Sequence, residues 1–122
     1  MNYQQLLATA MVHLGDNDEA AAQGAFEAAL AEAGRIDPDG PRVAECQNYL
    51  AQFHTQAGRA KEARAALEAV VRIYERFPDF AEGMKDYYLQ LMGLCAGLGD
   101  EAGAEAWREK AKALPASPKP WR

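Results

Sequence analysis

The feature that most constrains this fold is a pair of apolar stripes at helical spacing, joined by a glycine turn. In residues 37–74, Gly58 separates the two stripes. The first stripe comprises Cys46, Leu50, Phe53 and Ala57, and the second comprises Ala63, Leu67, Val70 and Tyr74. Residues three and four apart lie on one face of a helix, and glycine can end a helix in the left-handed conformation. This segment is therefore predicted to be an antiparallel helical hairpin.

The same unit occurs three times along the chain. Gly15, Gly58 and Gly99 each follow an apolar residue, at intervals of 43 and 41 residues. Alignment on these glycines brings three leucines to one position, namely Leu7, Leu50 and Leu91. A period of about 20 to 50 residues carried by paired helices is typical of a solenoid. We therefore predict an all-α, right-handed α-solenoid of three antiparallel helical hairpins, with a plain bundle of similar helices as the alternative.

The solenoid is expected to occupy residues 1–114, followed by a proline-rich tail at 115–122. Its buried core should include the repeated leucines and their neighbours: Leu7, Leu50, Phe53, Leu67, Val70 and Leu91. Asp18 and Asp100 are expected to be helix N-caps, and Pro41 suits a first helical position. Asp79, with Glu82 three residues later, resembles a capping box for the fifth helix.

Composition and charge disfavour several classes of function. The net charge of −5 gives no electrostatic reason to bind nucleic acid or an acidic membrane. No apolar run is long enough to span a bilayer, and the first residues lack the basic start and cleavage site of a signal peptide. Cys46 and Cys95 have no metal-binding spacing. We therefore expect two buried thiols, no cofactor and a cytoplasmic location.

The second unit resembles a known family. Residues 38–44, PDGPRVA, and residues 48–51, NYLA, are similar to the inter-repeat proline turn and the N-x-L-A helix of tetratricopeptide repeats. Residues 70–74, VVRIY, resemble the second helix of that family. The similarity is to the long repeats of about 42 residues found in kinesin light chains and many bacterial proteins. It covers about residues 3–114, although the third unit has a leucine in place of the asparagine and a shorter turn before it.

The resemblance implies that the first helix of each hairpin lines a concave groove, which binds a peptide or a partner protein. In the second unit a polar row faces away from the leucine stripe, and its amide side chains can donate to and accept from a peptide backbone. The candidate binding residues are Gln5, Thr9, Glu45, Asn48, Gln52, Thr55, Gln56 and Asp86. The ordinary explanation of such residues is a solvated helix face. Basic residues are rare on these helices, which disfavours a site for a C-terminal carboxylate.

Two other functions remain open at this point. Alanine-rich flat helices and Trp121 in the tail would suit self-assembly into a homo-oligomer. An enzyme on a helical bundle is a weaker alternative, because the chain lacks Glu-x-x-His, His-Glu-x-x-His and glycine-rich phosphate motifs. Cys46 and His54 would form a nucleophile pair only if folding brought them together. We therefore predict a non-catalytic interaction scaffold with a protein or peptide partner.

Overall fold

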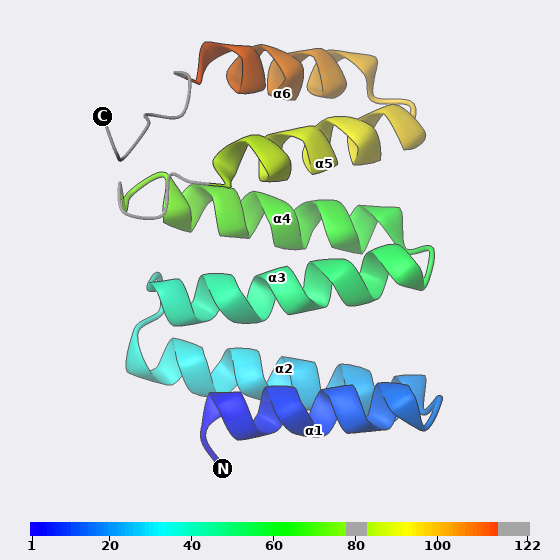
Figure 1. Cartoon of the computed structure of the whole chain (residues 1–122), viewed down its shortest axis with the longest axis vertical. Helices are drawn as coiled ribbons and strands as arrows, with labels where there is room; N and C mark the ends of the chain where they lie inside the picture. The colour runs from blue at the N-terminus through cyan, green and yellow to red at the C-terminus, as the bar shows by residue number, and fades with distance from the viewer. Residues whose placement is uncertain (78–82, 115–122) are drawn as a thin grey trace, which may run out of the picture.

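The computed structural model describes residues 1–77 and 83–114, which form six α-helices and no strand. The helices are α1 (Tyr3–Gly15), α2 (Glu19–Ile36), α3 (Pro41–Gln56), α4 (Ala60–Tyr74), α5 (Met84–Gly97) and α6 (Glu101–Ala113). Each helix packs against the next one along the chain, so that α1 and α6 lie at opposite ends of a single stack (Figure 1). The predicted all-α solenoid of three antiparallel hairpins is confirmed. The tail at 115–122 lies outside the described residues, and its boundary with the solenoid stays a prediction.

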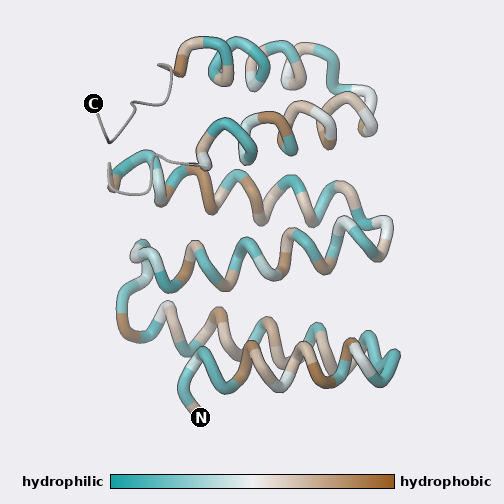
Figure 2. The backbone as a smooth tube through the Cα atoms, in the orientation of Figure 1, coloured by the Kyte–Doolittle hydropathy of each residue, from teal (hydrophilic) through white to brown (hydrophobic). Residues whose placement is uncertain are grey.

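The core runs through this stack as predicted. All six residues chosen from the sequence are buried, and the most accessible of them, Leu7, is 6% exposed. Neighbouring hairpins meet through aromatic side chains, since the Phe26 ring of α2 lies 5.5 Å from the Phe53 ring of α3, centroid to centroid. Apolar and polar segments alternate along the helices (Figure 2), as expected where each helix buries one stripe. The apolar stripes therefore hold each hairpin together and join it to the next.

The helix starts follow from local side-chain chemistry. Asp18 accepts a hydrogen bond from the Ala21 amide at 3.1 Å, and Asp100 accepts one from the Gly103 amide at 2.9 Å. These contacts confirm both predicted N-caps. Pro41 occupies the first position of α3, also as predicted. Asp79 and Glu82 lie outside the described residues, and α5 itself begins at Met84, directly after a glycine in the left-handed region.

The turns inside the hairpins correct one expectation. Gly58 and Gly99 have φ of +79° and +80°, but Gly15 remains helical and Asn17 takes the left-handed position instead, with φ of +59°. Asparagine tolerates this conformation better than most side chains do. The next residue closes each turn by donating its amide proton to a helix carbonyl: Asp18 to His13, Arg59 to His54 and Asp100 to Cys95, at 2.8 to 2.9 Å. The equivalent turn residues are therefore Asn17, Gly58 and Gly99, which are 41 residues apart in both intervals. The alignment of the first turn on Gly15, with its interval of 43 residues, was wrong.

This corrected register, which we call the turn register, changes which residues correspond between hairpins. Leu50 and Leu91 remain equivalent, but Asn48 now corresponds to Leu7 and Leu89. Leu7 is buried, Asn48 is half-buried and Leu89 is 38% exposed. A single position on the first helix of each hairpin therefore carries leucine twice and asparagine once.

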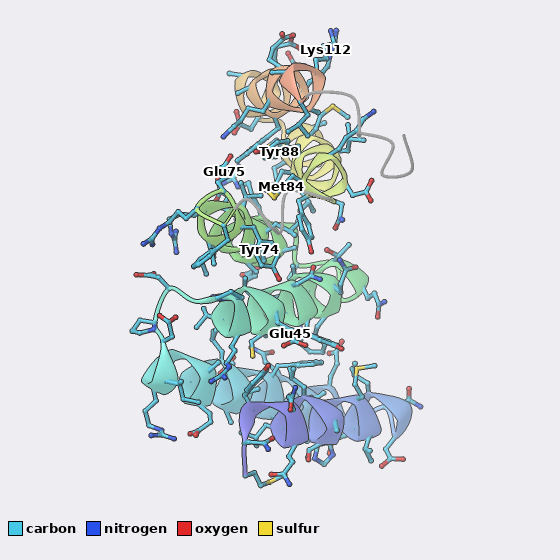
Figure 3. The ribbon with its side chains drawn as sticks, turned by 60° about the vertical axis from the view of Figure 1, so that its left-hand side comes forward. Glu45, Tyr74, Glu75, Met84, Tyr88 and Lys112 are labelled. Carbon is cyan, nitrogen blue, oxygen red and sulfur yellow. The ribbon has the colours of Figure 1, made fainter. Side chains whose placement is uncertain are left out.

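The last helix joins the stack through a polar and aromatic cluster. Tyr88 of α5 donates a hydrogen bond to Glu75 at 2.6 Å, and the Lys110 ammonium of α6 donates to the same carboxylate oxygen at 2.8 Å. The Trp107 ring of α6 stacks on the Tyr88 ring with centroids 5.7 Å apart. Figure 3 shows Glu75 and Tyr88 side by side between α4 and α5. Since Ala111 is the only buried residue of α6, these contacts carry much of its attachment.

Candidate peptide-binding surface

The first helices of the three hairpins are close enough for their side chains to interact. Glu45 of α3 lies close enough to Tyr3 of α1 to raise the pKa of that phenol, after the larger effect of burial. Further along, the Gln52 amide of α3 donates to the Gln90 side chain of α5 at 3.2 Å. The helices α1, α3 and α5 thus form one layer, and a side-chain hydrogen bond bridges the seam between α3 and α5.

Five of the eight predicted residues form a polar row on α3: Glu45, Asn48, Gln52, Thr55 and Gln56. Their spacing of three and four residues places them on one face of that helix. Glu45 and Asn48 are half-buried, whereas the other three are exposed. Thr55 donates its hydroxyl proton to the Ala51 carbonyl at 2.7 Å, which leaves its lone pairs as acceptors. The row therefore presents amide and oxygen groups next to the α5 seam.

Asn48 is the most unusual member of this row. Its side-chain oxygen Oδ1 is buried, and no described residue donates a hydrogen bond to it. An unsatisfied buried acceptor costs about 1–3 kcal/mol, and such a group in a folded protein calls for an explanation. The turn register adds to the anomaly, because the equivalent residues of α1 and α5 are both leucine.

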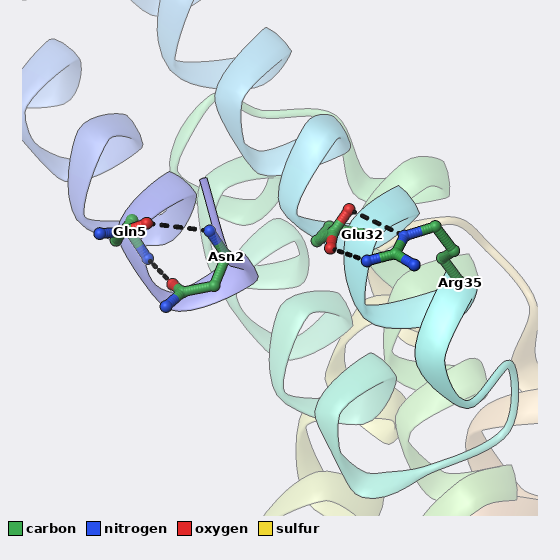
Figure 4. A network of polar contacts seen from close by, with 4 residues as sticks. All are labelled: Asn2, Gln5, Glu32 and Arg35. Carbon is green, nitrogen blue, oxygen red and sulfur yellow. Dashed lines mark hydrogen bonds and ion pairs between the residues drawn. The ribbon is translucent and has the colours of Figure 1, made fainter.

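The two candidates on α1 have other roles. Gln5 belongs to a capping box. Its side-chain oxygen accepts a hydrogen bond from the backbone N–H of Asn2 at 2.9 Å, and its own backbone N–H donates to the side-chain oxygen of Asn2 at 2.8 Å (Figure 4). Thr9 donates its hydroxyl proton to the Gln5 carbonyl at 2.9 Å. In the turn register these residues correspond to Cys46 and Leu50 and not to the polar row. The pattern Asn2-x-x-Gln5 is a recognisable capping signal, which the sequence analysis missed.

The eighth candidate, Asp86, is exposed in the first turn of α5 and is the equivalent of Glu45 in the turn register. Gln56 lies at the other end of the α3 row, where it borders a hollow of about 440 Å³. The other residues that line this hollow are Leu14, Asn17, Glu19, Phe53 and Ala57. The predicted row therefore has a carboxylate at one end and a partly apolar hollow at the other.

The cysteines and His54 have surroundings that suit packing. Both cysteines are buried and free, as predicted. Burial, followed by the charge of Glu45, raises the pKa of the Cys46 thiol to about 11, so very little thiolate forms at neutral pH. His54 is also buried, and its Nδ1 accepts a hydrogen bond from the Arg59 side chain at 3.0 Å. Burial and the nearby Arg59 charge lower the pKa of His54.

Within residues 1–77 and 83–114, no group of three or more histidine, cysteine or carboxylate side chains is placed to hold a metal ion. In the same part of the chain, none of the helices combines the length and apolar character needed to cross a membrane.

Comparison with known proteins identifies the fold. No protein-family model matches this sequence, and no curated protein matches it either. Among solved structures, the crystal structure of BtubC (BKLC) from P. vanneervenii is similar to this chain, with a TM-score of 0.77 and 21% sequence identity. The similarity covers 96% of this chain and 50% of BtubC, so the chain spans half the length of that protein. BtubC is a TPR-like helical-repeat protein. The chain described here therefore has a TPR-like helical-repeat fold.

Proposed function

We propose that this protein is a non-catalytic interaction module that binds a peptide segment of a partner protein along α1, α3 and α5. The orphaned Asn48 oxygen carries this proposal. The side chain as a whole is half-buried, and its rotation toward the surface would let the oxygen accept a hydrogen bond from a peptide backbone amide. The TPR-like fold supports it in general terms. The cytoplasmic location expected from the sequence stays a prediction.

The row around Asn48 has the chemistry for backbone recognition. Gln52 and Gln56 are exposed amides that both donate and accept. Gln52 is paired with Gln90 at 3.2 Å in an exposed contact, which a peptide could replace at small cost, because exposed neutral hydrogen bonds contribute little net stability. The proposed site therefore uses neutral hydrogen bonds more than charge along α3.

The test is a selection of binders from a displayed library of random dodecapeptides, using the whole chain as bait. Dissociation constants of the selected peptides are then measured for the parent and for Asn48→Ala combined with Gln52→Ala. Two neutral hydrogen bonds contribute about 0.5–1.5 kcal/mol each, so we expect affinity to fall roughly tenfold or more, with an almost unchanged melting temperature.

A matched control changes an exposed residue of α4. Glu68→Gln suits this purpose, because Glu68 is exposed and lies on the second helix of its hairpin. Arg64 is less suitable, since its guanidinium lies 3.4 Å from Asp100, the N-cap residue of α6. If Glu68→Gln abolishes binding and the double variant does not, the surface of α1, α3 and α5 is not the binding site.

One observation favours self-assembly as a second candidate. Val12 of α1 is 63% exposed, although its equivalent in the turn register is Phe53, which packs on Phe26 of the preceding hairpin. A second copy could cover Val12 in the same way. Light scattering should then give a mass above 13.3 kDa that falls on dilution and on Val12→Glu substitution. A concentration-independent monomer would eliminate this candidate. Trp121, the other expected contact, lies outside the described residues.

A further inference from the structure

Three tyrosines from different helices lie near the acidic end of the polar row, two of them close to Glu45 and the third beside Tyr74. We call Tyr3, Tyr74, Tyr87 and Glu45 the tyrosine cluster. Glu45 lies close enough to Tyr3 and Tyr74 to raise the pKa of both phenols, and the Tyr74 and Tyr87 rings lie 5.9 Å apart, centroid to centroid. Figure 3 shows Tyr74 of α4 above Glu45 of α3. All four side chains are half-buried, so each keeps part of its surface accessible.

The charges around this cluster are mostly negative. Burial and then the nearby Glu45 raise the pKa of Tyr3, while burial and then Asp86 raise the pKa of Tyr87. For Tyr74, burial, then Tyr87 and then Glu45 raise the pKa. The Arg42 charge acts in the opposite direction on Tyr3. The phenols therefore remain neutral at physiological pH, with two carboxylates and one guanidinium close by.

We propose that the tyrosine cluster holds a cationic side chain, an arginine or a lysine, of the bound peptide. The inference rests on the proposed function and names the chemistry of one part of the partner. Aromatic faces attract cations, and the oxygens of a carboxylate accept hydrogen bonds from a guanidinium or an ammonium group. The net charge of −5 on the whole chain favours the approach of a basic segment.

The charge of Glu45 distinguishes a cation-binding role of the cluster from a simple packing role of its tyrosines. Packing alone would be served by apolar residues, and a half-buried carboxylate among rings loses part of its hydration. A cation placed against Glu45 would offset that loss. Tyrosine suits such a contact because it offers a large surface with little side-chain entropy to lose.

The experiment uses the dodecapeptides selected on the whole chain. We expect them to share one arginine or lysine. Where it is an arginine, its replacement by the uncharged citrulline should weaken binding roughly tenfold or more, because hydrogen bonds between charged groups are stronger than neutral ones. Glu45→Gln should produce a similar loss and should add little to the citrulline effect. Glu68→Gln makes the same charge change on α4 and should leave the affinity unchanged.

Ring variants test the aromatic part. Tyr87→Phe keeps the ring and should retain most of the binding, whereas Tyr87→Leu should weaken it, provided that circular dichroism shows the same fold for both. Peptides that bind through Asn48 and Gln52 but are indifferent to Glu45→Gln would overturn this inference and leave the proposed function standing. If no peptide binding responds to either set of variants, both ideas fail.

Discussion

Replacing Asn48 with leucine should stabilise the protein and remove its binding. The side-chain oxygen of Asn48 is buried without a donor among the described residues, and the equivalent positions carry Leu7 and Leu89. Leucine has the same branched shape and the same number of side-chain heavy atoms as asparagine, and it has no polar atom to satisfy. Removing an unsatisfied acceptor recovers about 1–3 kcal/mol. Because Asn48 is only half-buried, we expect a gain near the lower end, about 1–2 kcal/mol.

Urea unfolding followed by far-UV circular dichroism measures this gain. The midpoint should rise with an unchanged slope, since the surface exposed on unfolding stays the same, and each kcal/mol should raise Tm by roughly 4 °C in a domain of this size. Gln52→Leu is the matched control, because Gln52 is exposed on the same helix face and should give no gain. An Asn48→Leu protein less stable than the parent would mean that Oδ1 is satisfied in solution. The observation that carries the proposed function would then be lost.

Three further predictions test the core, the turns and the helix contacts. Leu50→Ala should cost about 2–5 kcal/mol in urea unfolding, and Leu89→Ala, at an exposed leucine, should cost less than about 1 kcal/mol; equal costs would refute the proposed burial. Gly58→Ala should lower the free energy of unfolding by about 1 kcal/mol, because φ is +79° there. Gly15→Ala should raise it by a similar amount, because Gly15 is helical and the new methyl group would have open space around it. Burial alone would raise the pKa of Glu75, but hydrogen bonds from Lys110 and Tyr88 outweigh it, and the net shift is downward from 4.5. A depressed carboxyl pKa gives stability that is present above about pH 4.5 and is lost as pH falls through the folded-state pKa, so Lys110→Met should flatten the acid limb of a stability-versus-pH curve.

The hairpins could be predicted because helix periodicity is a local signal. The stripe around Leu50 and the caps at Asp18 and Asp100 depend only on residues a few positions apart, and the structure confirms them. The first turn could not be fixed in the same way. Gly15 and Asn17 can both adopt the left-handed conformation, and the choice between them depends on where α2 begins.

The candidate site was less accessible to sequence reasoning. The polar row on α3 follows from spacing within one helix, and so it could be proposed directly. Gln5 and Thr9 were included through an alignment that the turns do not follow. The tyrosine cluster combines residues of α1, α3, α4 and α5, and only tertiary packing brings Tyr3 and Tyr74 near the same carboxylate.

The 41-residue spacing of Asn17, Gly58 and Gly99 also means that the length of this chain can change in whole steps. A duplication that starts at one of these turn residues and ends just before the next inserts a complete module. Residues 17–57 are one such module, because the copied Asn17 would follow Ala57 and fill the left-handed position that Gly58 occupies now. First and second helices of the hairpins then still alternate along the lengthened stack, as they do now. Duplication by unequal recombination could therefore lengthen such an array without new loop sequences, whereas a short insertion inside a helix would turn the following residues of that helix away from its buried stripe.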